Sequence, residues 1–141
     1  MSDRCFVDTN ILLYAHDASQ GSKHARAREL VRELWNRRCG VLSTQVLQEL
    51  CFNLQRKLAR PLEPRATREV IEDYLRWQIV QNTEESVLEA LGIQERYMLR
   101  FWDALIVQAA EVGGAAVLYS EDFSHGQAYG SVRVVNPFLS Q

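Results

Sequence analysis

The chain alternates short apolar runs with longer amphipathic stretches. Apolar runs predict short strands, and they lie at residues 5–7, 40–43, 116–120 and 132–135. Between them, apolar residues recur at helical spacing, which predicts helices at residues 11–16, 22–38, 44–58, 64–77, 84–98 and 101–114. Strands that alternate with helices predict a parallel sheet covered by helices on both faces.

Two of these helices show the pattern most clearly. In 22–38 the expected buried face consists of Ala27, Leu30, Val31, Leu34 and Trp35. In 44–58 it consists of Leu47, Leu50, Cys51, Leu54 and Leu58. The 64–77 helix begins with a proline, which suits a first turn, and Gly113 and Gly114 are expected to stop the last helix.

Length and composition indicate an ordinary globular protein. The 141 residues suit one domain over 1–141, and 47% hydrophobic with 24% charged residues is typical of a soluble chain. We expect a cytoplasmic protein with no membrane association, because the N-terminus lacks a signal-peptide apolar segment and no apolar run could span a bilayer. The three cysteines show no CxxC spacing and are expected to be reduced thiols.

Asp8 is an ionisable residue placed directly after the most apolar strand, in the stretch "CFVDTNILLYAHD". One interpretation is structural, since Asp, Thr and Asn are all good N-cap residues for a following helix. The other is functional, because parallel α/β sheets place their sites at the carboxyl ends of strands. The segment alone leaves both interpretations open.

Three further acids stand in unusual places. Glu49 lies within the 44–58 helix beside its apolar face, and Asp103 falls in the first turn of an otherwise apolar helix. Glu121 and Asp122 follow a strand, as Asp8 does. Each also has an ordinary explanation: a half-exposed surface residue, an acid at a helix start, or a cap of a turn.

Together, the four acids Asp8, Glu49, Asp103 and Asp122 can converge at one edge of a parallel sheet. Carboxylates brought together repel one another unless a cation or a proton intervenes. Oxygen ligands without nearby His or Cys favour Mg²⁺, with Mn²⁺ as the alternative, over Zn²⁺. The pattern therefore predicts a divalent-metal site.

The charge distribution indicates an anionic partner despite a net charge of −2. Residues 23–68 carry eleven Lys and Arg against four Glu, whereas residues 69–122 carry eleven acids against three Arg. A phosphate backbone could approach along the basic region. Alternatively, folding intermixes these charges. Candidate contacts to such a backbone are Arg26, Arg28, Arg56, Lys57 and Arg60.

The motifs "FVDTNILLYAHD", "STQVLQEL", "FWDALIVQAA" and "LYSEDFSHGQ…VRVVNPF" resemble, in order and spacing, those of PIN-domain ribonucleases, and more narrowly VapC-type toxins of bacterial toxin–antitoxin pairs. The resemblance implies a three-layer α/β/α PIN-like domain with a short central parallel β-sheet. It implies a Mg²⁺-dependent endoribonuclease that forms a homodimer and is blocked by a cognate antitoxin.

On this resemblance, the catalytic and metal-binding acids fall on Asp8, Glu49, Asp103 and Asp122. Thr9, Asn10 and Ser120 would hold these acids in place through hydrogen bonds. Glu121, adjacent to Asp122, leaves the fourth assignment open. The alternative function is a catalytically inactive PIN-like module that binds RNA or protein. The sequence does not reveal which RNA is cut.

Overall fold

The structure is a computed structural model that describes residues 2–139. Its strands are β1 Cys5–Val7, β2 Gly40–Ser43, β3 Gln78–Val80, β4 Val117–Tyr119, β5 Ala128–Tyr129 and β6 Val132–Val135. Its helices are α1 Thr9–Ala15, the short 3-10 helix η1 Ala18–Gln20, α2 Ser22–Arg37, α3 Thr44–Leu54, α4 Pro64–Tyr74, α5 Glu84–Tyr97 and α6 Phe101–Val112.

The strands form one sheet in the order β3-β2-β1-β4-β6-β5. All neighbours are parallel except β5, which pairs antiparallel with β6. Cys5 of β1 lies opposite Gly40 of β2 on one side and Val117 of β4 on the other. Consequently β1 is an inner strand. Asp8, the residue that follows it, lies at the carboxyl edge of the sheet, between the ends of β2 and β4.

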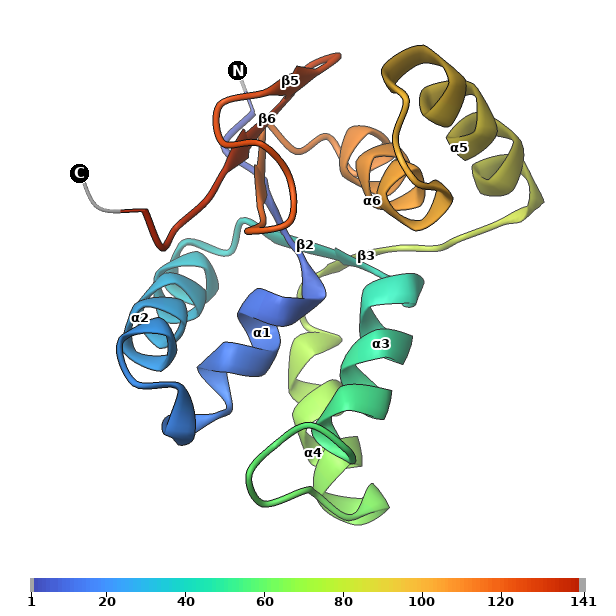
Figure 1. The fold of residues 1–141 in the computed structure, drawn as a ribbon. Helices are drawn as coiled ribbons and strands as arrows, with labels where there is room; N and C mark the ends of the chain where they lie inside the picture. The colour runs from blue at the N-terminus through green and yellow to red at the C-terminus, as the bar shows by residue number, and fades with distance from the viewer. Residues whose placement is uncertain (1, 140–141) are drawn as a thin grey trace.

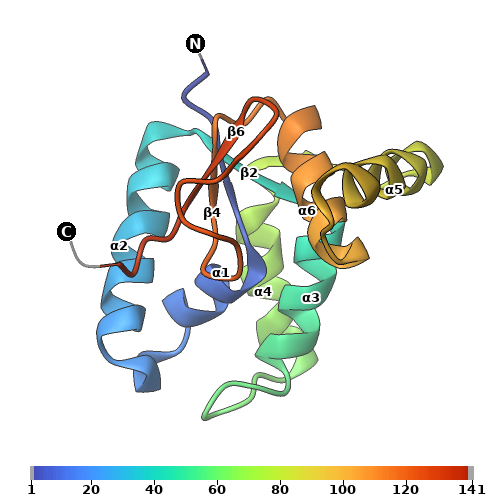
Figure 2. The same cartoon turned by 45° about the horizontal axis from the view of Figure 1, so that its top comes forward.

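Helices cover both faces of the sheet, as the alternating pattern predicts. Figures 1 and 2 show α1 and α2 on one side and α6 on the other, with α5 packed outside α6. Helices α3 and α4 lie side by side beyond the carboxyl edge, next to α1. This is the three-layer α/β/α arrangement expected of the fold.

The core explains why β1 is apolar at every position. Phe6 and Val7 are completely buried, because one faces each helical layer. Ile11 and Leu12 of α1 are also fully buried against the sheet. Helix α1 therefore begins immediately after Asp8 and packs its apolar face against the sheet.

The predicted helix 44–58 is four residues too long. Helix α3 ends at Leu54, where the backbone N–H of Lys57 turns back to the carbonyl of Asn53 and that of Leu62 bonds to the carbonyl of Leu54. Leu58 is buried from this turn, as expected, but Leu47 and Cys51 are only half-buried. Trp35 of α2 is likewise half-buried.

The predicted helix 64–77 ends at Tyr74, and the sequence prediction missed strands β3 and β5. Strand β3 exists because Gln78–Val80 pairs with Val41–Ser43 of β2. Two or three residues carry too little periodicity to reveal a strand, so its pairing partner decides it. The other predicted elements are present, with ends that differ by one or two residues.

Within residues 2–139, none of the helices combines the length and apolar character that crossing a bilayer requires.

Gly40 provides a test of how closely β2 packs on its neighbours. A Cβ at this position would lie 2.2 Å from Cε3 of the buried Trp77 ring. We expect Gly40→Ala to lower the free energy of unfolding by about 2 kcal/mol, because the ring cannot move without disturbing the core. Guanidinium unfolding measures the change.

Gly92 is the matched control. It lies within α5, and a Cβ there would meet nothing within 4 Å. Gly92→Ala should therefore stabilise the protein by roughly 0.5 kcal/mol through helix propensity. Equal stability of Gly40→Ala and the parent would contradict the packing of Trp77 against β2.

Candidate active site

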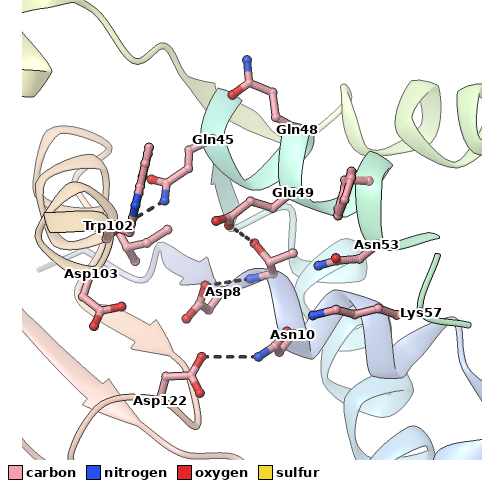
Figure 3. A pocket seen from close by; sticks show the side chains of 13 residues that line it. Asp8, Asn10, Gln45, Gln48, Glu49, Asn53, Lys57, Trp102, Asp103 and Asp122 are labelled. Atoms are coloured by element: carbon pink, nitrogen blue, oxygen red, sulfur yellow. Dashed lines mark hydrogen bonds between the residues drawn. The ribbon is translucent and has the colours of Figure 1, made fainter. Parts of the chain in front are cut away.

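One cavity of about 580 Å³ opens at the carboxyl edge of the sheet. Asp8, Glu49, Asp103 and Asp122 all line it. Figure 3 shows these four side chains around a common space, reached from α3, α6 and the segments that follow β1 and β4. The structure thus brings together the four acids that sequence reasoning singled out.

Asp8 is the buried centre of this group. Its Oδ1 accepts a hydrogen bond from the backbone N–H of Thr9 at 2.8 Å, and its Oδ2 accepts one from the Ser120 hydroxyl at 2.8 Å. Asp8 is also the N-cap of α1. The capping interpretation is therefore confirmed, and Asp8 also lines the cavity, while its functional role stays a prediction.

Hydrogen bonds also position Glu49 and Asp122. The Thr9 hydroxyl donates to Glu49 Oε1 at 2.7 Å, so Thr9 links Asp8 to Glu49. Ser120 accepts a hydrogen bond from the backbone N–H of Asp122 at 3.0 Å while it donates to Asp8. Asn10 donates to Asp122 Oδ2 at 3.4 Å. Thr9, Asn10 and Ser120 thus each hydrogen-bond to members of the four-acid group, as predicted.

Asp103 comes from the first turn of α6 and faces the same cavity. Arg100, the N-cap residue of α6, donates from Nε to Asp103 Oδ2 at 3.1 Å. The Arg100 side chain is largely exposed, so this pair lies at the rim.

Burial raises the proton affinity of Asp8 and Asp122, and neighbouring carboxylates add to the rise. Burial raises the pKa of Asp8 to about 6, and the charges of Asp122 and Glu49 add to the rise, while hydrogen bonds from Ser120 and Thr9 oppose it. Burial also raises the pKa of Asp122, with further increases from Glu121 and Asp103. At neutral pH, ionisation of Asp8 and Asp122 therefore costs the folded state free energy.

Glu121 has a different environment from its neighbour Asp122. Its carboxylate pairs with Lys23 at 2.7 Å and accepts a hydrogen bond from the Tyr14 hydroxyl. Burial alone would raise the pKa of Glu121, but these hydrogen bonds outweigh it and lower the pKa. Glu121 is not among the residues that line the cavity, whereas Asp122 is.

The five predicted RNA contacts lie in different places. Lys57 lines the cavity, and Figure 3 shows it extending toward Asn10. Arg56 lies over the ring of Phe52, another lining residue, and Arg60 is exposed in the turn beyond α3. Arg26 and Arg28 lie on α2 outside the cavity lining, and Arg26 donates to the carbonyl of Pro137.

Sequence reasoning missed several lining residues. They are Gln45, Gln48, Phe52, Asn53, Trp102 and Ile106. The glutamines and Asn53 lie on the polar stripe of α3 that carries Glu49, which was a usable signal. Phe52 and Trp102 gave no signal, because an aromatic residue in an amphipathic helix is ordinarily counted as core. Here both are exposed, Trp102 by 64%.

The donor set fits a hard divalent cation. Four carboxylates and the amides of Gln45 and Asn10 line the cavity, without His or Cys. Asp8 is almost completely buried and is hydrogen-bonded to neutral groups, so its charge has no cationic partner. Across residues 2–139, no three acidic, His or Cys side chains are already grouped closely enough to share one metal ion.

A family profile described as the PIN domain matches residues 5–129 of the chain. The chain belongs to the PIN domain family. A search of curated protein sequences found no match to this PIN domain.

Solved structures share its fold. A toxin–antitoxin complex from Klebsiella pneumoniae aligns with a TM-score of 0.67 at 15% identity, covering 95% of this chain and 98% of the other. Mycobacterium tuberculosis VapC20, a sarcin–ricin-loop-cleaving toxin, aligns with a TM-score of 0.63 at 21% identity over 82% and 88%. DNA-bound VapBC from Salmonella typhimurium aligns with a TM-score of 0.64 at 17% identity over 95% and 97%.

The raised pKa of Asp8 makes a prediction about stability. Because the pKa rises from 3.8 to about 6 on folding, folding favours the protonated form, and ionisation destabilises the folded state as pH rises through 6. That shift corresponds to roughly 3 kcal/mol. Asp8→Asn removes the destabilising charge but also loses the acceptor for Ser120. We therefore expect it to raise the free energy of unfolding by about 1 kcal/mol at pH 7.5 without metal, and not to raise it at pH 4.

Thermal melts with EDTA, and with added Mg²⁺ or Mn²⁺, measure both effects. Metal should raise the Tm of the parent, and Asp8→Asn should remove most of that increase. Glu121→Gln, which alters an acid outside the cavity lining, should retain it. A full metal-induced increase in Asp8→Asn would exclude Asp8 from the metal site.

Proposed function

We propose that this PIN domain is a Mg²⁺-dependent endoribonuclease, and that it acts as the toxin of a type II toxin–antitoxin pair. The observation that carries the proposal is the convergence of Asp8, Glu49, Asp103 and Asp122 on one open cavity. The fold similarity to VapC20, an RNA-cleaving toxin, supports RNA as the substrate. The retention of all four acids favours an enzyme over an inactive binding module.

The residues divide into ligands and supports. Asp8, Asp103 and Asp122 would hold Mg²⁺, or Mn²⁺, and Glu49 would act through water. Ser120 and Thr9 fix the Asp8 carboxylate on both of its oxygens. When bound, the ion supplies charge neutralisation at the phosphate and lowers the pKa of water.

The chain's own groups then position the reaction. Glu49, fixed by the Thr9 hydroxyl, accepts a hydrogen bond from the attacking water and orients it. Lys57 at the cavity edge attracts the phosphate backbone. Water adds to phosphorus and the bond to the 3′ oxygen breaks, so the products carry a 5′-phosphate and a 3′-hydroxyl.

The same cavity suits inhibition by a cognate antitoxin. Apolar side chains of Phe52, Trp102 and Ile106 line it beside the carboxylates. An amphipathic antitoxin segment could bury its apolar side there and place an Arg or Lys near Asp8 and Asp103. The fold similarity to toxin–antitoxin complexes supports this partner.

We also propose a homodimer, formed through the outer face of α5. Val87, Leu88 and Leu91 lie on neighbouring positions of this helix, and all are exposed, Leu88 by 69%. Met98, at the end of the same helix, is exposed by 87%. A cluster of large apolar side chains in water favours association, and a second copy of the chain is the partner that the family resemblance implies.

Cleavage of a mixed RNA substrate tests the nuclease. With Mg²⁺ the parent should cleave, and Asp8→Asn or Asp103→Asn should lower the rate by at least about 100-fold, because each removes a metal ligand. Glu121→Gln is the matched control and should keep the rate within about threefold. RNA binding without metal-dependent cleavage by the parent would instead favour the inactive module.

Light scattering after size exclusion tests the dimer. Leu88→Glu should shift the protein to a monomer, because a charge in an apolar interface lacks a partner. Leu75→Glu, also at an exposed leucine but at the end of α4, should leave the dimer intact. A dimer in both variants would place the interface elsewhere.

A further inference from the structure

A second polar surface lies at the amino ends of the strands, opposite the carboxylates. One hollow of about 660 Å³ is lined by residues just before three strands: Arg4 one residue before β1, Arg38 two residues before β2 and Arg76 two residues before β3. Asp8 follows the other end of β1, four residues beyond Arg4, which is roughly 13 Å along an extended chain. This hollow is therefore separate from the candidate active site.

A second hollow of about 650 Å³ adjoins the first. The two share Trp35 and Asn36 of α2, and the second adds Arg28 and Arg32 from the same helix. It extends to Ala15 at the end of α1. Because α1 begins at Thr9 in the active-site cavity and rises about 10 Å, the two hollows form a groove that starts one short helix away from the carboxylates.

Across the part of the chain that the structure describes, the Asp, Glu, Lys and Arg side chains that line this groove are all arginines, and burial lowers the pKa of His16. Five arginines and two histidines line the two hollows, and no Asp or Glu does. Among residues 2–139, none of these five arginines forms a salt bridge. Of the nearby acids, Glu29 and Glu33 pair with Arg26 and Arg37, whereas the charge of Asp73 acts on the lining residues His16 and Tyr74. Cations left without partners around a concave surface attract a polyanion.

Aromatic rings form the floor where the hollows meet. The Trp35 ring centroid lies 5.2 Å from that of Tyr74 and 5.6 Å from that of Trp77, so each ring limits the movement of the others. Trp35 is partly buried and lines both hollows. A fixed, accessible indole beside guanidinium groups is the arrangement on which proteins stack unpaired bases while binding the phosphates between them.

We propose that this groove, lined by Arg4, Arg28, Arg32, Arg38, Arg76 and Trp35, is a second RNA-binding site that holds a single-stranded region of the substrate away from the cleaved bond. The proposal rests on the RNA-cleaving function proposed above and adds a substrate requirement. RNA long enough to reach the groove binds more tightly than RNA that fills only the active-site cavity.

The test uses the double variant Arg32→Ala/Arg76→Ala, with one substitution in each hollow. Arg65→Ala/Arg68→Ala is the control, since both arginines are exposed on α4 and line neither hollow. Fluorescence anisotropy in EDTA measures binding of an oligouridine of about 20 nucleotides over a range of salt concentrations. Cleavage of tetrauridine with Mg²⁺ is measured in parallel.

The groove variant should bind the long probe about tenfold more weakly and lose about 1.4 from its salt slope, which is the loss of two phosphate contacts on a single strand. Its tetrauridine cleavage should equal that of the parent. Parental affinity and slope, or an equal loss in the control, would overturn the proposal. The proposal would also be overturned if the groove variant bound RNA as the parent does but no longer bound polyglutamate in the same assay. That result would make the groove a site for an acidic protein.

The two readouts separate this proposal from the proposed nuclease. If the parent cleaves neither tetrauridine nor the mixed RNA substrate but the groove variant still loses affinity and salt slope, the groove is supported and the nuclease is not. If cleavage occurs but the long probe binds both variants equally, the nuclease is supported and the groove is rejected.

Discussion

The burial of one carboxylate, that of Asp8, is the constraint around which the pocket is built. An inner strand ends there, so Asp8 lies between the segments that follow β2 and β4 with little access to water. Such a group needs hydrogen bonds on both oxygens, and Thr9 and Ser120 provide them. Those two residues in turn hold Glu49 and Asp122. One buried charge thereby orders three of the four acids.

Asp8 caps a helix and lines the cavity, and its burial opposes the charge that a metal ligand would need. As the N-cap of α1, Asp8 accepts a backbone N–H whether or not it is ionised. As a ligand in the proposed metal site it would be ionised, although burial and neighbouring carboxylates raise its pKa. A bound cation relieves this conflict. The conflict is a physical argument for the metal that is proposed above.

Charge is distributed differently in space from its order along the sequence. Lys23, from the basic residues 23–68, pairs with Glu121, from the acidic residues 69–122. Folding therefore mixes part of the charge that is separated along the sequence. What remains separates the two edges of the sheet. Carboxylates line the cavity at the carboxyl edge, and arginines line the hollows at the amino edge. Arg4 and Arg76, from outside the basic segment, contribute to the second group.

By itself the sequence determined the alternation of strands and helices, the position of β1 and the four acids that line the cavity. These could be predicted because the spacing of apolar residues, and an acid next to an apolar run, are local features of the sequence. It did not determine β3, which exists through its pairing with β2, or the end of α3, where Leu62 bonds back to Leu54. Nor did it distinguish Glu121 from Asp122. Only tertiary structure placed Lys23 and Tyr14 beside Glu121, because these partners lie about a hundred residues away and no local pattern encodes such a contact.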